Sequence, residues 1–163
     1  MGGVRAPGVR GNGEIRPESV RLGKVLEFMR LLWAVDHGLH TLSKRMESRL
    51  GVTAPQRFVM RLVGRFPDSS AGHIAGLLSI HPSTLTGVLK RLESRQLLVR
   101  TDDTRDRRRT LLRLTDQGKK LDALRGPGTA ESAVRRALGR FDESELAVAR
   151  KVLVAIAEEL DRE

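Results

Sequence analysis

The sequence predicts a mostly α-helical protein with one small β-hairpin. Over most of the 163 residues, apolar side chains recur at steps of three and four, which places them on one face of a helix. Residues 97–101 and 110–115 carry the signals of two short strands; in the second, apolar side chains alternate with polar or outward-facing ones. Nearly all of the eight residues between these strands are charged, so the hairpin is expected to present a strongly basic loop.

The composition indicates a polyanionic partner. The formal net charge of +10 favours nucleic acid or an anionic membrane surface. Cysteine is absent, which excludes disulfides, cysteine-based zinc sites and thiol redox sensing. No apolar run approaches the roughly 18 residues that span a bilayer, and the N-terminus lacks the apolar segment of a secretory signal. We therefore expect a soluble cytoplasmic protein with no membrane partner.

The N-terminal part is expected to be an arm followed by one long helix. Residues 1–17 are rich in glycine, proline and arginine, which predicts a disordered basic arm. From Glu18 to about Leu50 the apolar pattern is helical. A helix of roughly thirty residues is long for a globular core, so we expect part of it to pack against a second subunit.

Three shorter helices are expected next. Thr53 is a candidate N-cap for the first of them, which ends at Pro67. Ser69 or Ser70 then caps a short helix over 71–78. A turn follows, and Pro82 starts a helix that runs to about Arg95. This order of helices and turn predicts a helix-turn-helix unit.

The helix over 82–95 has two contrasting faces. One face is apolar, and the other combines short hydroxyls, a glycine and two cations: Ser83, Thr84, Thr86, Gly87, Lys90 and Arg91. Small residues let a helix approach the floor of the DNA major groove, where hydroxyls and cations bond to base edges and phosphates. Taken alone, this face is also compatible with the solvated side of an ordinary amphipathic helix.

The loop of the hairpin strengthens the interpretation as a DNA-binding unit. Its charged residues include Arg105, Asp106, Arg107, Arg108 and Arg109. Arginines so close together repel one another unless a polyanion is present, and Asp106 is expected to orient a neighbouring guanidinium. Arginine at the tip of such a loop suits the narrow, negative minor groove. A helix followed by a basic hairpin is the winged helix-turn-helix pattern.

The C-terminal third is expected to be helical again. Thr115 is a candidate N-cap, and the Gly-Pro-Gly sequence at 126–128 is expected to interrupt or kink the helix that it starts. The helical pattern resumes at about Ala130. Asp142 and Glu145 form a variant capping box for a last helix with a continuous apolar stripe.

These motifs resemble the MarR family of dimeric winged-helix transcriptional regulators over roughly residues 20–162. Residues 103–108 are similar to the family's D-P-x-D-R-R wing motif, and residues 112–118 to its L-x-L-T-x-x-G motif. Residues 83–93 resemble its recognition helix, and residues 52–56 the start of its first DNA-lobe helix. The resemblance implies that Arg107 is the minor-groove arginine and that Asp106 is its partner.

The chain departs from the family pattern at three places. Thr104 stands where the wing motif has proline, and Gln96 stands where a helix-ending glycine is common. A non-glycine residue in a left-handed cap costs about 1 kcal/mol. The Gly-Pro-Gly sequence at 126–128 is unusual in the helix after the wing.

The sequence therefore predicts a sequence-specific double-stranded DNA-binding transcriptional regulator, expected to be a repressor. It would act as a homodimer on a pseudo-palindromic operator and be relieved by a small-molecule ligand. Residues 18–162 would form one domain, with a helical dimerisation region at 18–52 and 116–162 and a winged helix-turn-helix lobe at 53–115. The alternatives are a winged-helix protein–protein interaction module and a non-specific architectural DNA binder.

The resemblance also implies a small-molecule pocket that the long first helix helps to form. Trp33, His37 and His40 are the candidate ligand-binding residues, and an aromatic acid or a phenol would suit them. The alternative is that Trp33 belongs to the core and the histidines are partly exposed. No carboxylate cluster completes a metal site, and no glycine-rich phosphate loop is present, so neither a metal, nor a cofactor, nor an enzymatic activity is predicted.

Overall fold

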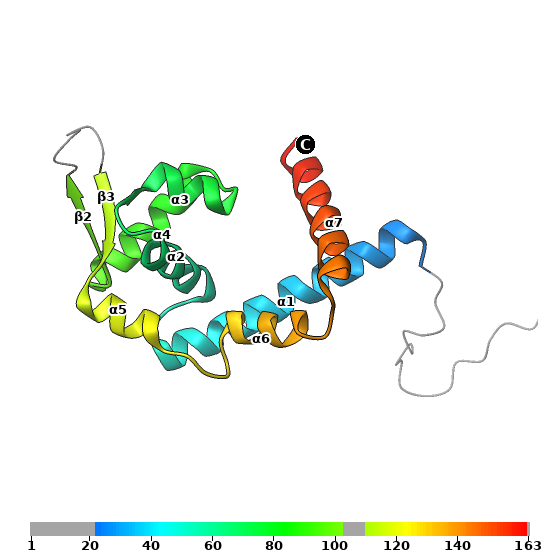
Figure 1. Ribbon diagram of the computed structural model, residues 1–163, viewed down its shortest axis with the longest axis horizontal. Coiled ribbons are helices and arrows are strands. Elements are labelled where there is room, and N and C mark those ends of the chain that lie inside the picture. Colours follow the sequence, from blue (N-terminus) through cyan, green and yellow to red (C-terminus); the bar gives the residue numbers. More distant parts are fainter. Residues whose placement is uncertain (1–21, 103–109, 163) are drawn as a thin grey trace, which may run out of the picture. The chain divides into compact units, whose positions relative to one another are not determined.

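The computed structural model describes residues 22–102 and 110–162, and these are mostly helical with one small antiparallel sheet (Figure 1). This architecture confirms the predicted fold class. Residues 1–17 and the wing-loop arginines, for which predictions were made above, lie outside the described residues. In chain order the elements are α1 (Lys24–Leu50), α2 (Ala54–Arg65), β1 (Ser69–Ser70), α3 (Ala71–Leu78), α4 (Pro82–Ser94), β2 (Leu98–Asp102), β3 (Thr110–Leu114), α5 (Asp116–Ala123), α6 (Ala130–Leu138) and α7 (Glu143–Arg162).

The chain divides into two compact units, Met1–His37 and Gly38–Glu163, whose boundary falls within α1. The helix was expected to begin at Glu18, but the described residues 22 and 23 are not helical and α1 begins at Lys24. Gly23 disfavours helix through its backbone freedom and no side chain packs against it, which accounts for the later start. Most side chains along α1 are exposed in the single chain, and Met46 is the buried residue of its C-terminal half.

The second unit contains a small core made by α2, α3, α4 and the sheet. Its buried side chains come from these elements and from the residues that lead into α2 and β2: Val52, Val59, Met60, Val63, Ile74, Ala75, Leu85, Leu89, Leu92, Leu97, Leu98, Leu112 and Leu114. The caps that start its helices agree with the predictions. Thr53 forms a capping box with Gln56, and the Ser70 hydroxyl accepts the His73 N–H at 3.2 Å. These caps fix the first residues of α2 and α3, and α4 begins after the turn that ends α3.

The sheet has three strands in the order β1-β3-β2, one more than the sequence predicted. Residues Ser69 and Ser70 pair antiparallel with Leu112 and Leu111, next to the Asp68 N–H, which donates to the Leu112 carbonyl. A two-residue strand has no pattern of its own to detect in sequence, because its pairing with β3 is what makes it a strand. The pairing fastens the base of the hairpin to the start of α3.

The Gly-Pro-Gly sequence separates α5 from α6, as predicted. Gly126 and Gly128 have φ values of 153° and 81°, which favour glycine. At the end of α5, the guanidinium of Arg57 on α2 donates to the carbonyls of Leu121 and Leu124 at 3.0 and 2.6 Å. The same guanidinium donates to Glu131 at the start of α6 at 2.9 Å. An arginine of α2 thus joins both sides of the break.

The last two helices bury none of their described side chains within the single chain. Asp142 and Glu145 form the predicted capping box at the start of α7, with both N–H···O distances at 2.9 Å. The apolar stripe of α7 is exposed. In the described part of the chain, no helix is both long and apolar enough to cross a membrane.

Candidate nucleic-acid interface

The orientation of α4 is set by three leucines on its inner face. Leu85, Leu89 and Leu92 are completely or almost completely buried in the core, so the opposite face of the helix points away from the lobe. All six side chains predicted on that face are exposed: Ser83, Thr84, Thr86, Gly87, Lys90 and Arg91. The structure therefore gathers these candidate residues on one free surface of one rigid helix.

Gly87 is not required by the fold. A Cβ atom added at Gly87 would meet nothing within 4 Å. Gly118 in α5 is different, since a Cβ there would lie 2.0 Å from the Leu97 carbonyl oxygen. A glycine inside a helix costs about 1 kcal/mol relative to alanine, so Gly87 weakens α4 without any packing benefit in this chain. Its small size instead opens the outer face to close approach by a partner.

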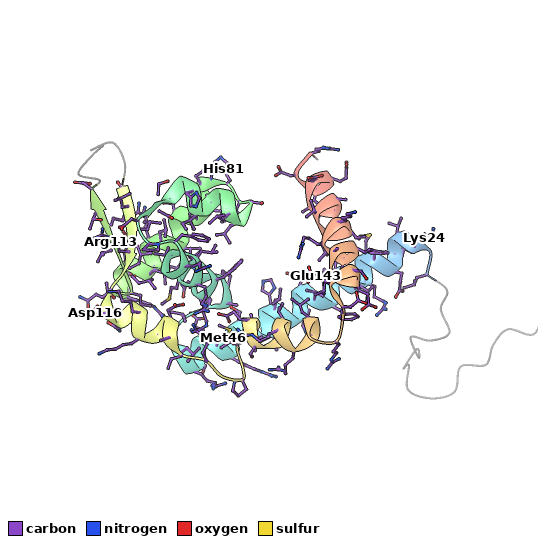
Figure 2. All side chains as sticks on the ribbon, in the orientation of Figure 1. Lys24, Met46, His81, Arg113, Asp116 and Glu143 are labelled. Atoms are coloured by element: carbon purple, nitrogen blue, oxygen red, sulfur yellow. The ribbon has the colours of Figure 1, made fainter. Side chains whose placement is uncertain are left out.

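Short hydrogen bonds order the hydroxyls on this face. The N-cap of α4 is His81, whose position at the helix start is labelled in Figure 2. Its Nδ1 accepts the Ser83 N–H at 3.3 Å and lies 2.8 Å from the Ser83 hydroxyl. The Thr86 hydroxyl donates to the Pro82 carbonyl at 2.9 Å. His81 was not among the predicted site residues, because histidine is not a usual N-cap; its place directly before Pro82 was the available signal.

The charges on the outer face are positive. Lys90 and Arg91 form no ion pair with any residue that the structure describes. The acid on the same helix, Glu93, receives two hydrogen bonds from Arg100 of β2, at 2.6 and 3.2 Å. Because Arg100 neutralises Glu93, the surface that α4 presents attracts a polyanion.

The end of α4 has the left-handed cap that the sequence suggested at Gln96. This residue has φ 56°, and the N–H groups of Gln96 and Leu97 donate to the carbonyls of Glu93 and Leu92 at 2.8 and 3.0 Å. This pair of bonds is a Schellman motif. The Thr115 hydroxyl donates to the Gln96 carbonyl at 2.6 Å and also caps α5. The corner therefore holds α4 and the hairpin in a fixed relation.

The base of the wing is anchored by an ion pair. The Arg113 guanidinium donates to the Asp68 carboxylate, and this hydrogen bond holds the pKa of Asp68 below its usual range. Cα pairing of Asp102 with Thr110 brings the two ends of the wing loop together. The loop residues Arg105, Asp106, Arg107, Arg108 and Arg109 lie outside the described residues, so their predicted role rests on the sequence.

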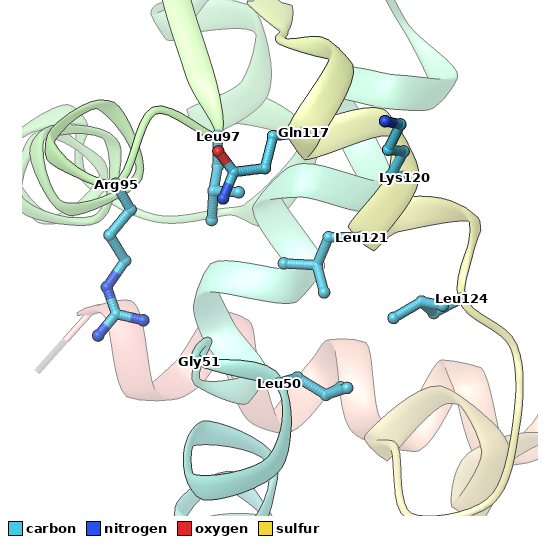
Figure 3. Close-up of a pocket in the computed structure, with 8 residues that line it drawn as sticks. All are labelled: Leu50, Gly51, Arg95, Leu97, Gln117, Lys120, Leu121 and Leu124. Atoms are coloured by element: carbon cyan, nitrogen blue, oxygen red, sulfur yellow. The ribbon is translucent and has the colours of Figure 1, made fainter.

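A cavity of about 560 Å³ lies beneath the recognition helix, where the end of α1, the α4–β2 corner and α5 meet (Figure 3). Its walls combine leucines with two cations and one amide: Leu50, Gly51, Arg95, Leu97, Gln117, Lys120, Leu121 and Leu124. Sequence reasoning missed this site, because its residues come from three distant segments.

The candidate ligand residues of the sequence lie elsewhere. Trp33 is 75% exposed, and His37 and His40 are also exposed on α1. None of the three lines the cavity in Figure 3. The expectation that Trp33 belongs to the core is wrong for the single chain. Among the described residues, no three His, Asp or Glu side chains gather in a way that would hold a metal ion.

Comparison with known proteins identifies the family of this lobe. The MarR family profile matches residues 52–110, which extend from the start of α2 to the start of β3. The HTH-type transcriptional regulator FarR of Neisseria gonorrhoeae is 32% identical over 104 residues, which cover 63% of this chain and 71% of FarR. The chain belongs to the MarR family. Membership places it among transcriptional regulators and not among enzymes.

Two further MarR-family comparisons agree with this assignment. The HTH-type transcriptional repressor MdtR of Bacillus subtilis (strain 168) is 38% identical over 68 residues; the match covers 42% of this chain and 44% of MdtR, less than half of its length. A MarR mutant from E. coli, solved in complex with operator DNA, has the same fold at a TM-score of 0.65 and 21% identity. That likeness covers 85% of this chain and 99% of the E. coli chain.

Proposed function

We propose that this MarR-family protein is a homodimeric repressor that binds a pseudo-palindromic operator in double-stranded DNA. The observation that carries the proposal is the outer face of α4, where small, hydroxyl and cationic side chains surround a glycine that the fold does not need. Such a face fits the major groove. Two copies related by a two-fold axis would place their recognition helices about one helical turn apart. A protein of this kind acts where the genome is, in the cytoplasm.

The wing would add contacts to the minor groove on either side. Arg107 is the proposed groove-inserted arginine and Asp106 its orienting partner, while Arg105, Arg108 and Arg109 would bind phosphates. The change Arg107→Ala is expected to weaken operator binding at least tenfold, as loss of one specific groove contact does. Fluorescence anisotropy with a labelled operator measures the loss. Circular dichroism and sedimentation should show unchanged helix content and assembly; unchanged affinity would remove the wing from the proposal.

Dimerisation would use the helical segments outside the lobe, residues 18–52 and 116–162, leaving 53–115 to bind DNA. Helix α7 and the first half of α1 expose large apolar side chains in the single chain: Val25, Leu26, Met29, Trp33, Val35, Val148, Leu153, Val154 and Leu160. Burial of such surface drives association. A second copy of the chain is the partner proposed to cover these faces.

We further propose that a small amphipathic anion relieves repression. Arg95 and Lys120 supply positive charge beside the leucines of the 560 Å³ cavity, and Arg95 directly follows α4. A ligand there releases DNA only if it binds the DNA-free conformation more tightly. Aromatic carboxylates and phenols, titrated by calorimetry, are the probes. Loss of binding in Lys120→Ala supports this cavity, whereas loss in Trp33→Ala supports the set Trp33, His37 and His40.

The experiment that tests the main proposal is selection of bound duplexes from sheared genomic DNA of the source organism, at about 150 mM salt to suppress phosphate-only binding. A shared pseudo-palindrome next to a promoter supports the regulator. Bound DNA without a shared motif would instead support an architectural DNA binder. If no DNA is recovered in a parallel low-salt selection either, the basic face serves a protein partner and the proposal fails.

A further inference from the structure

Two hydroxyls on the outer face of α4 already donate their protons within the protein. Ser83 and Thr86 are both exposed, and both belong to the face proposed to enter the major groove. A hydroxyl normally donates one hydrogen bond and accepts two. If its proton is engaged inside the helix, only its lone pairs remain for DNA. The direction of these two hydrogen bonds therefore bears on which bases the helix recognises.

For Ser83, the direction follows from His81. The Ser83 backbone N–H points at Nδ1 of His81, 3.3 Å away, an arrangement that fits the ring tautomer with a lone pair on Nδ1 and its proton on Nε2. The Ser83 hydroxyl oxygen lies 2.8 Å from the same Nδ1. At that distance two facing lone pairs would repel each other, so the hydroxyl must donate its proton to Nδ1. The oxygen of Ser83 then faces outward as an acceptor.

For Thr86, the partner is a carbonyl, which accepts and never donates. The Thr86 Oγ1 lies 2.9 Å from the Pro82 carbonyl oxygen one turn earlier, so the hydroxyl donates its proton to that carbonyl. Thr86 therefore also presents lone pairs to the outside. Thr84 differs from both, because its hydroxyl has no hydrogen-bond partner among the residues that the structure describes. Thr84 keeps its proton free to donate.

We propose that Ser83 and Thr86 recognise exocyclic amino groups in the major groove, namely N6 of adenine or N4 of cytosine. This inference rests on the proposed function as a DNA-binding regulator. In the major groove, adenine and cytosine present amino donors, whereas guanine O6 and N7 and thymine O4 are acceptors. A hydroxyl that can only accept a hydrogen bond pairs with the amino groups of adenine and cytosine, and it is repelled by the acceptors of guanine and thymine.

The same reasoning disfavours phosphate as the partner of these two side chains. Phosphate oxygens only accept hydrogen bonds, so a hydroxyl that has already donated its proton gains nothing from them. The cations Lys90 and Arg91, and the free hydroxyl of Thr84, take the phosphate contacts. His81 is a positioning residue in this arrangement: its ring nitrogen fixes the polarity of Ser83 without touching a base.

The first test removes single amino groups from the selected operator. Adenine is replaced by purine, or cytosine by 2-pyrimidinone, one position at a time, and the Kd is measured for the full-length protein. At one position per half-site the wild type is expected to lose about three- to tenfold in affinity, the effect of one hydrogen bond. The Ser83→Ala variant should show no loss at that position. Thr84→Ala, the matched control, should keep the full loss.

The second test changes the acceptor that holds Ser83. In His81→Asn the side-chain oxygen is still an N-cap acceptor, so the preference for an amino group should persist. His81→Leu removes the acceptor and frees the Ser83 proton, so selection of duplexes should now admit guanine or thymine at that position. Base preference is a ratio between duplexes, and a general loss of helix stability in His81→Leu therefore leaves it unchanged.

The outcomes separate this inference from the proposed function. If the wild type selects no shared motif, both are wrong. If it selects a motif but amino deletion costs wild type and Ser83→Ala equally at every position, the regulator stands and the acceptor-only recognition by Ser83 is overturned. The same conclusion follows if His81→Leu and His81→Asn select identical bases.

Discussion

Gly87 is the residue at which the requirements of folding and of DNA binding differ most clearly. A Cβ at this position would contact no atom of the chain within 4 Å, yet glycine weakens the helix in which it lies. The lack of a side chain at Gly87 is therefore useful only if a molecule outside the chain approaches α4 closely. DNA in the major groove is the partner that the surrounding hydroxyls and cations fit.

The change Gly87→Ala is accordingly expected to raise stability and lower affinity. The free energy of unfolding should rise by about 0.5–1 kcal/mol, because alanine is the better helix former. Operator affinity should fall at least tenfold, because the new methyl group keeps the helix from the groove floor. Urea denaturation and fluorescence anisotropy measure the two effects. Gly38→Ala, on α1, is the control that should stabilise without this loss; a Gly87→Ala protein that binds normally would show that α4 does not approach the groove closely.

At the scale of the elements, the boundary between α5 and α6 depends on one buried arginine. Arg57 is 2% exposed and donates to two carbonyls at the end of α5 and to Glu131 of α6. Arg61, one turn further along α2, bonds to Asp122 of α5 and lies 3.8 Å from Glu131 of α6, so it spans the break more weakly and is more exposed. Although the Gly-Pro-Gly sequence interrupts the backbone helix, α5 and α6 stay linked, because side chains of α2 bond to both of them.

Replacing Arg57 by alanine should cost about 2–4 kcal/mol of unfolding free energy, since it removes a buried guanidinium that donates to two carbonyls and a carboxylate. Arg61→Ala, the control with a more solvated guanidinium, should cost about 1 kcal/mol or less. Hydrogen exchange locates the effect: the amides of residues 121–133 should lose protection first. Equal protection in the two variants would contradict the role of Arg57 as the link across the break.

The start of α7 should respond to acid. Hydrogen bonds from the Ser144 hydroxyl and the Glu145 N–H lower the pKa of Asp142 from its usual range. Since the folded-state pKa lies below the unfolded value of about 3.9, the cap stabilises α7 fully above that value, and its effect is lost as the pH falls through the folded pKa. NMR shifts of residues 142–146 should show the first turn fraying in that range. In Asp142→Asn, which caps without titrating, the fraying should be absent.

How much of these elements the sequence could predict depended on the range of the interactions. Thr53, Thr115 and Asp142 were identified as caps because their partners lie three residues away. The left-handed cap at Gln96 was expected from the family pattern, in which glycine is common at this position. Strand β1 was missed because its partner strand lies more than forty residues further along the chain. The role of Arg57 was missed likewise, since its acceptors are 64–74 residues away.

The candidate site divides in the same way. The outward face of α4 followed from helical spacing and is exposed as predicted, whereas the cavity lined by Arg95 and Lys120 required the packing of three separate segments. Periodicity identifies which face a helix buries, but it contains no information about which other element closes a cavity. Trp33 is a further example. Its spacing on the helix identified it as an apolar residue that should be covered, but spacing does not identify the surface that covers it.

At the scale of the whole molecule, the exposed apolar side chains of α7 require a partner. Val152, Leu153 and Leu160 lie on a helix that buries nothing in the single chain, and Leu153 is 57% exposed. A contiguous apolar face of this kind is rare on a monomer. In the proposed assembly, a second copy covers it and thereby sets the distance between the two recognition helices.

Leu153→Glu is therefore expected to dissociate the dimer while the DNA-binding lobe stays folded, because the substitution buries a charge only in the assembly. Sedimentation equilibrium should show monomers, and near-native lobe amide shifts should confirm the fold. Operator affinity should fall by about 100-fold or more, since two half-sites would no longer be bound by linked lobes. Lys151→Glu also introduces a carboxylate on the same helix, with a larger change of net charge, and should leave assembly intact. A Leu153→Glu protein that remains a dimer would place the interface elsewhere, and one that binds as a monomer with wild-type affinity would show that the two lobes act independently.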